Sequence, residues 1–348
     1  MSKAKVIALS CFLIMFSFSC KEKENNNSHD TFIERLECVS DSIQVDEIVV
    51  LNLFKSQILA HMAGTFDSLM IIEKVYIPHR ELWNNCYGMI FGEENASKFT
   101  TSNGMVEWNR RLYPQNQDFF DQRATELMAI NLDSVLESTL KKFSKLTPFK
   151  PRARISILFA PLQGIGFGGC TSEEFCFELN NREYDVAYTV EKGIPHELNH
   201  FAYEPLRAYD PDQGTALFLT IDEGFACYFT WLFFDGQISL HEAVENMSKE
   251  DWNWYLENEK RIFDTLKPYF SDKSGDNPLL RNDNYALFPE APKTLYYWLG
   301  FRIVQSYIRT FGEDAWMDIY NMNVREVLEK SKYEFYLQDP SPAPGASG

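Results

Sequence analysis

The spacing of apolar residues divides the chain into a helical first part, a short stretch of strands and a second helical part. Over 41–64 and 117–143, apolar residues recur at three and four spacings with few Gly or Pro, which predicts amphipathic helices. Residues 154–159 form a short β-branched run and residues 174–178 alternate with period two, so both predict strands. Further helices are expected around 196–200 and over about 215–234, 240–268 and 295–311. We therefore expect an α+β protein, predominantly helical, with a small sheet preceding the helix at 196–200.

A glycine-rich segment, Gly164-Ile-Gly-Phe-Gly-Gly169, lies between the two predicted strands. Its spacing matches the GxGxxG pattern of phosphate-binding loops. No helix follows it, and no acidic residue stands at the distance that a dinucleotide site requires. The segment is therefore expected to be a flexible loop between strands.

The N-terminus has the three parts of an export signal. Lys3 and Lys5 precede an apolar run over 6–18, which is too short to span a bilayer comfortably. The run ends in Ser-Phe-Ser-Cys20, which resembles a bacterial lipobox, so we expect residues 1–19 to be removed and Cys20 to be acylated. A plain cleaved signal and an uncleaved short anchor are the alternatives. We predict an exported protein, lipid-anchored to the bacterial cell envelope at the outer membrane and facing either the periplasm or the cell surface.

Composition limits the remaining possibilities. The 348 residues are 45% hydrophobic, enough for a sizeable core. The formal charge of −17, or −19 without the two signal-peptide lysines, would repel phosphate backbones, and no basic patch is present, so nucleic acid is not an expected partner. We expect the protein to be a monomer. Along the chain we expect a tether at 20–30, an N-terminal helical lobe at 31–150, a zincin-like domain at 151–337 and a disordered tail at 338–348.

Five cysteines remain after Cys20 and the signal peptide are set aside, and an odd number excludes a complete disulfide framework. Cys170 and Cys176 are near enough in sequence to close a short loop by a disulfide. Two buried free thiols are the alternative.

The most informative pattern is His196-Glu197-Leu-Asn-His200. Residues four apart on an α-helix share a face, so the two imidazoles can bind one ion, at Zn–N distances of about 2.0–2.1 Å. Glu197 would lie beside the metal, where it can accept a proton from a zinc-bound water. Apolar residues at 194, 198 and 201 supply a face for burial. The spacing predicts a catalytic Zn²⁺ site, and two surface histidines on a helix are the alternative.

A catalytic zinc needs a third protein ligand. Glu223, in Thr220-Ile-Asp-Glu-Gly-Phe-Ala, lies 23 residues after His200 on the next predicted helix and is the best candidate. Small residues at 224 and 226 would let the two helices pack closely. Asp222 is the main alternative, and Glu204 and Asp210 are further ones.

His-Glu-x-x-His followed by Glu-Gly-x-Ala resembles the gluzincin group of zinc peptidases, and within it a bacterial family of zinc-dependent peptidases of unknown function. The likeness covers roughly 152–333 and includes Asn284-Tyr285 and the segment 296–305. It implies an oxyanion donor, for which we consider Tyr296 and Tyr297, although both also fit an aromatic core patch. Cys227 stands where many gluzincins have a histidine-orienting Asp, and Asp222 is the substitute considered.

The resemblance and the motif together predict a zinc metallopeptidase in which Glu197 is the general base and a peptide or protein is the substrate. The strand at 154–159 is considered as an edge to which an extended peptide could add. Arg302 could meet a substrate carboxylate, but we expect it to form a salt bridge. The alternatives are a non-catalytic surface lipoprotein that binds a nutrient or glycan, and a zinc hydrolase of a non-peptide substrate.

Overall fold

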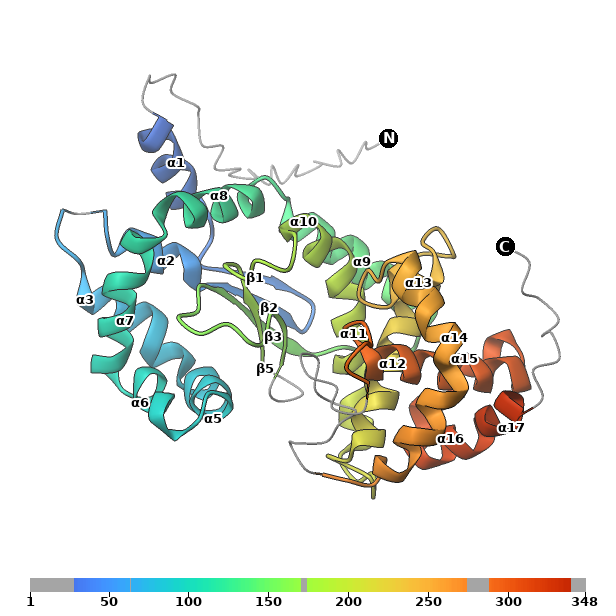
Figure 1. The fold of residues 1–348 in the computed structure, drawn as a ribbon. Helices are drawn as coiled ribbons and strands as arrows, with labels where there is room; N and C mark the ends of the chain where they lie inside the picture. Colours follow the sequence, from blue (N-terminus) through green and yellow to red (C-terminus); the bar gives the residue numbers. More distant parts are fainter. Residues whose placement is uncertain (1–27, 63, 170–173, 274–287, 339–348) are drawn as a thin grey trace, which may run out of the picture.

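The protein is mostly helical and contains one small sheet, as Figure 1 shows. The computed structural model describes residues 28–62, 64–169, 174–273 and 288–338. Figure 1 shows the sheet between a group of N-terminal helices and a larger group of C-terminal helices. The predicted α+β class is therefore confirmed at the level of helix and strand content.

The sheet has five strands in the order β1-β2-β3-β5-β4. Their bounds are β1 Ser42–Val45, β2 Ile48–Asn52, β3 Ala153–Leu158, β4 Phe167–Gly169 and β5 Glu174–Glu178. β3 pairs in parallel with both β2 and β5, whereas β1 and β4 pair antiparallel at the two edges. The strand predicted at 154–159 is thus present, but its proposed role as an edge for an added peptide is wrong, because both of its sides are already paired.

The predicted helix over 41–64 is also wrong. This segment forms the hairpin of β1 and β2, with Asp46 in the left-handed region at φ 51°, and only then the short helix α2 (Leu53–Leu59). Residues 48–51 are a continuous apolar run, which fits a strand buried on both faces better than an amphipathic helix. Because β2 pairs with β3, the sheet joins residues on both sides of position 150, where the boundary between two lobes was expected.

The glycine-rich segment is more ordered than a flexible loop. Its second half is β4, which pairs with β5 over 167–169. The carboxylate of Glu178, on β5, accepts hydrogen bonds from the backbone N–H groups of Gly164 and Gly166 at 3.2 and 2.9 Å. The hydroxyl of Tyr87 donates to the same carboxylate at 3.0 Å. The buried Glu178 therefore holds this segment against the sheet.

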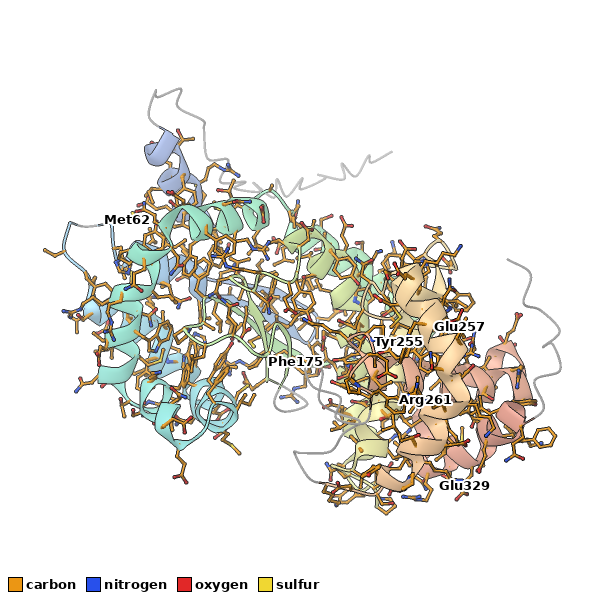
Figure 2. The ribbon with its side chains drawn as sticks, viewed as in Figure 1. Met62, Phe175, Tyr255, Glu257, Arg261 and Glu329 are labelled. Carbon is orange, nitrogen blue, oxygen red and sulfur yellow. The ribbon has the colours of Figure 1, made fainter. Side chains whose placement is uncertain are left out.

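Alternation along β3 and β5 divides the apolar residues between two cores. Ile155 and Phe175 face a large core that includes the C-terminal helices, whereas Leu158 and Cys176 face a smaller core under the N-terminal helices. Figure 2 shows Phe175 where the sheet meets the C-terminal helices. Its ring makes an edge contact with Phe201, with centroids 4.0 Å apart. This contact joins the sheet to the helix that carries the two motif histidines.

The N-terminal helices contribute to both cores: Phe99 and Trp108 belong to the smaller core, whereas Phe120 and Leu136 belong to the large one. Their bounds are α1 Ser28–Glu37, α3 Ser68–Met70, α4 Arg80–Leu82, α5 Gly88–Ile90, α6 Glu93–Thr100, α7 Ser102–Gln115, α8 Gln117–Met128 and α9 Leu132–Leu146, with π-helical turns at Ile71–Tyr76 and Trp83–Tyr87. The single helix predicted over 117–143 is two helices. The side chain of Asn131 accepts a hydrogen bond from Ser134 N at 3.1 Å and so begins α9 with a new N-cap.

After β5, the described residues up to 338 form helices and connecting turns without a further strand. Their bounds are α10 Val186–Tyr188, α11 Ile194–Tyr203, α12 Ala216–Phe233, α13 Leu240–Ala243, α14 Lys249–Leu266, α15 Leu295–Phe311, α16 Val324–Ser331 and α17 Tyr333–Gln338. One of them, α12, is apolar and long enough to cross a membrane, but 78% of it is buried inside the protein. It is therefore the core helix of the C-terminal half, packed between α11 and α15.

Several predictions from the sequence fall on the chain ends. The signal peptide, Cys20 and most of the tether lie outside the described residues, as do positions 339–348 of the predicted tail. α1 begins at Ser28, inside the segment expected to be a tether, and α17 extends to Gln338.

The described part of the chain contains Cys38, Cys86, Cys176 and Cys227, and Cys170 lies outside it. Cys38 takes part in a disulfide, and so does Cys86, whereas Cys176 and Cys227 are buried free thiols. The considered disulfide between Cys170 and Cys176 is therefore wrong. The strand β5 turns the Cys176 side chain into the smaller core, 3.3 Å from the hydroxyl of Tyr87.

Candidate metal site

The motif residues lie on α11, every residue of which is buried. Pro195 stands near the start of α11, but Gly193 before it already has helical dihedrals, with φ −68° and ψ −43°. Pro195 therefore lies inside a longer helical run, where its missing N–H removes an intrahelical donor. A π-helical turn, Thr189–Gly193, leads directly into this helix. The apolar residues Leu198 and Phe201 face the large core, as their spacing predicted. The helix is thus held rigidly from behind, and His196 and His200 project from its other side.

The two histidines and Glu223 converge on one point. Nε2 of His196 lies 3.1 Å from Nε2 of His200, and Oε2 of Glu223 lies 3.1 and 3.2 Å from these two atoms. Ligands bound to a tetrahedral zinc at 2.0–2.1 Å stand about 3.3 Å from one another. The three atoms therefore have the separation that a shared zinc ion requires, and the residues present fit that ion.

Of the four carboxylates considered as third ligand, only Glu223 faces both Nε2 atoms. Asp222 lies behind His200, with Oδ2 3.1 Å from Nδ1 of that ring. A carboxylate in this position fixes the orientation and tautomer of a ligating histidine. Glu204 lies near the same side of His200, whereas Asp210 accepts hydrogen bonds from Arg207 and from Val324 N. The geometry thus gives Asp222 the orienting place that we considered for it.

The ionisation of the group differs from that of free side chains. Despite its burial, the pKa of Glu223 is held far below its usual value, because the charges of His200 and His196 and their hydrogen bonds favour the carboxylate. Burial raises the pKa of Glu197 to about 7, against the opposing charges of the same histidines. Glu197 is 6% exposed. Glu197 therefore has a pKa near neutral pH and is adjacent to the ligand His196, as a general base would need to be.

The two tyrosines considered as oxyanion donors lie at the start of α15. The ring of Tyr297 stacks beside His196, with centroids 6.2 Å apart, and Tyr296 packs against Tyr297 with centroids 4.5 Å apart. Burial and then the charge of Glu223 raise the pKa of Tyr297. Arg302 makes the salt bridge that we expected, with Nε 2.7 Å from Oε1 of Glu259. Of this helix, Tyr297 is the residue nearest to the motif.

The small residues after Glu223 pack against a different helix from the one expected. A Cβ at Gly224 would stand 2.0 Å from the carbonyl carbon of Gly300, and a Cβ at Gly300 would stand 1.7 Å from the carbonyl oxygen of Thr220. Gly224 therefore allows α12 to cross α15 in backbone contact, and does not face α11. This crossing places Glu223 and Tyr297 on the same side of α11.

Two further residues near His196 were not singled out as part of the site. Sγ of Cys227 lies 4.0 Å from Nδ1 of His196, and the carboxylate of Glu245 lies within 4.8 Å of ligand atoms of both residues. Cys227 follows Glu223 by one helical turn, so its proximity could have been deduced. Glu245 comes from the turn after α13, and no spacing in the sequence connects it to α11.

Another cavity lies away from the metal site. It has a volume of about 760 Å³ and is lined by α1, β1 and the corner between α8 and α9, with no residue of the metal site. Its size is in the range of small-molecule pockets. Among the described residues that line it, Phe54 is the one aromatic side chain.

The segment of the chain that carries the site is similar to a family of motility proteins. Residues 180–335 match the family model described as Gliding motility protein GldB. No characterised protein sequence and no solved structure has significant similarity to the chain.

The family match corrects the resemblance drawn from the motif. The segment likened to zinc peptidases matches the model of a gliding motility lipoprotein and not that of a peptidase family, so the resemblance to a zinc peptidase family is wrong. A His-Glu-x-x-His pattern is five residues long, and such a pattern alone does not identify a family. The match agrees with the lipoprotein predicted from the N-terminus.

Proposed function

We propose that this chain is a lipid-anchored protein of the cell envelope that binds one zinc ion through His196, His200 and Glu223. The observation that carries the zinc site is the separation of the three ligand atoms, 3.1, 3.1 and 3.2 Å, on two buried helices. The match to the lipoprotein family supports the anchored location.

The family match favours a non-catalytic role over a catalytic one. It covers α11, α12 and α15, so the residues of the metal site belong to the part that resembles gliding motility proteins. In this proposal the ion joins α11 to α12 and stabilises the C-terminal half of a protein that acts in a motility assembly of the envelope. Structural zinc sites contribute directly to folding free energy.

The decisive experiment is metal analysis of the full-length protein in detergent. We expect about one zinc per chain, and its loss in His196→Ala and Glu223→Ala. His79→Ala is the matched control, since His79 lies at the start of α4, in the other half of the chain, and is absent from the ligand groups. A wild-type protein that stays metal-free in micromolar zinc, or a His196→Ala variant that keeps its zinc, would show that the site is not a zinc site.

A second candidate, a zinc-dependent hydrolase, is favoured by the position of Glu197. This carboxyl group is buried next to His196 and has a pKa raised to about 7, which suits transfer of a proton from water to a leaving group. The ion, when bound, would act as a Lewis acid and lower the pKa of a coordinated water. Tyr297 could then donate to the oxygen that becomes negative, since its ring lies beside that of His196.

Glu197→Gln separates the two candidates. If the protein is a hydrolase, the zinc-loaded wild type cleaves members of a peptide or ester library, and Glu197→Gln keeps zinc but loses at least about a hundredfold in rate. If the role is non-catalytic, both proteins bind zinc and neither cleaves any substrate. Inactivity of the zinc-loaded wild type against both libraries therefore counts against the hydrolase and leaves the zinc site intact.

A further inference from the structure

One edge of the sheet presents backbone groups that no neighbouring strand uses. Among the described strands, β1 is outermost and pairs with β2. The backbone N–H of Asn52 donates to the carbonyl oxygen of Asp41 at 2.9 Å, and in an antiparallel pair every second residue faces the partner strand in this way. The N–H and C=O groups of Ser42 and Gln44 therefore point away from the sheet. In the described part of the chain, no other backbone group bonds to them.

The cavity of about 760 Å³ adjoins this edge. Ile43, in the middle of β1, lines the cavity and packs against the large core. Residues directly opposite each other on neighbouring strands share a face of the sheet, so a strand added to β1 would direct the side chain opposite Ile43 to the same side. The buried lining there includes Phe54, Leu127 and Leu132. The cavity can thus take an apolar side chain.

The rim of the cavity is mainly acidic. Carboxylates predominate among the exposed charged residues that line it, which are Glu34, Arg35, Glu37 and Asp133. The turn after β1 adds two more exposed carboxylates, those of Asp46 and Glu47. Antiparallel pairing of two copies of β1 would place the turn of each copy near the rim of the other, where like charges repel. A basic segment would be attracted to the same surface.

We infer that β1 and this cavity form a docking site for an extended, basic segment of a partner protein. The segment adds to β1 as a further strand, and its backbone pairs with Ser42 and Gln44. It places an apolar side chain opposite Ile43, in the cavity, and a lysine or arginine at the acidic rim. The docking site contains none of the proposed metal ligands and lies outside residues 180–335, so it goes beyond the proposed function and does not depend on it.

Short synthetic peptides test the docking site without knowledge of the partner. They alternate threonine with leucine, and their ends carry lysine; in the matched peptides serine replaces leucine, or glutamate replaces lysine. Fluorescence anisotropy of labelled peptides measures their binding to the full-length protein in detergent. We expect the leucine–lysine peptide to bind, and each replacement to weaken binding at least about tenfold. Absence of binding by the leucine–lysine peptide up to about 1 mM overturns the docking site.

A second pair of probes tests the strand pairing itself. The leucine–lysine peptide with every second amide N-methylated keeps its side chains but cannot pair with an edge, so it should not bind. In the protein, Gln44→Pro removes an outward N–H and leaves the bonds to β2, since proline is accepted on the outer side of an edge strand. It should weaken binding at least about tenfold, whereas Gln44→Thr keeps the N–H and should bind as wild type does. Unchanged binding by the N-methylated peptide, or by Gln44→Pro, overturns strand addition.

Charge reversal tests the rim. Glu34→Lys combined with Glu37→Lys should weaken the leucine–lysine peptide at least about tenfold at low salt. Glu257→Lys changes the charge at an exposed position of α14, labelled in Figure 2, and is the matched control. Equal binding by the rim variant and the control overturns the basic partner. A wild-type dimer in sedimentation that Gln44→Pro dissociates would show that a second copy occupies the edge, and the proposed partner would then be wrong.

Discussion

The crossing of α12 and α15 allows a sharp test of how the site is positioned. Replacing Gly300 by Ala puts a Cβ 1.7 Å from the carbonyl oxygen of Thr220, whereas real Cβ contacts are not shorter than 3.0 Å. The atom that would clash belongs to the backbone of α12, so no side-chain rotation can relieve the contact. The two helices must therefore separate, along an interface that is among the most extensive in the protein.

Overpacking of a well-packed core usually costs 1–3 kcal/mol, and a backbone clash of this depth belongs at the upper end, about 3 kcal/mol. One kcal/mol changes the melting temperature of a domain of this size by about 2–4 °C, so Gly300→Ala should melt about 6–12 °C below wild type. Since Glu223 precedes Gly224 on the displaced helix, the affinity for zinc should also fall. Differential scanning calorimetry and a competitive zinc chelator measure the two effects.

Gly168→Ala is the matched control. A Cβ at Gly168 would meet its nearest atom, in the Ile165 side chain, at an ordinary 3.7 Å, so stability should change by less than about 0.5 kcal/mol. Gly224→Ala opens the same gap as Gly300→Ala, and the double variant should therefore cost less than the sum of the two. The backbone contact does not hold the helices together if Gly300→Ala has the melting temperature of the wild type. The same follows if the stability losses of Gly224→Ala and Gly300→Ala add up in the double variant.

Three further predictions concern single side chains. Asp222→Asn should weaken zinc binding by about 10–100-fold, because its carboxylate lies 3.1 Å from Nδ1 of His200; an unchanged dissociation constant in chelator competition would contradict this role. Tyr320→Phe removes the buried hydrogen bond from its hydroxyl to Oδ1 of Asn199, 2.6 Å long, and should lower the free energy of unfolding by about 1–3 kcal/mol in urea titrations; no loss would mean that the pair contributes nothing. Burial lowers the pKa of His79 from 6.5 to about 4, so between these pH values the unfolded chain binds a proton that the folded chain excludes. Wild type should lose about 1–3 kcal/mol more than His79→Gln as the pH falls from 6.5 to 4, and parallel stability profiles of the two proteins would refute this.

Local patterns predicted two of the strands. The alternation at 174–178 and the β-branched run at 154–159 both became strands within one residue of the expected bounds. The pattern over 41–64 misled, because a continuous apolar run satisfies helical spacing as well as a buried strand. What decides between them is the pairing of β2 with β3, a hundred residues later in the chain.

The residues of the metal site also fall into those that the sequence could place and those that it could not. His196 and His200 share a helix face, so their convergence follows from helix geometry alone. Glu223 could be nominated from the sequence but not distinguished from Asp222, since adjacent residues on a helix differ by about 100° in direction and the sequence does not show which direction faces α11. The family was misjudged, because short motifs such as His-Glu-x-x-His and Glu-Gly-x-Ala say little about a fold of this size.

By itself, the sequence determined the acidic charge, the mainly helical class and the pair of histidines one turn apart, and it predicted the export signal. These properties depend on composition or on contacts within a few residues, which a linear pattern contains. Only the tertiary structure decided that Glu223 faces both imidazoles, that Asp222 stands behind His200, and that Glu245 and Tyr297 come close to His196. Those placements depend on how closely α12 approaches α15 and on where the turn after α13 folds back, and such long-range packing has no counterpart in local spacing.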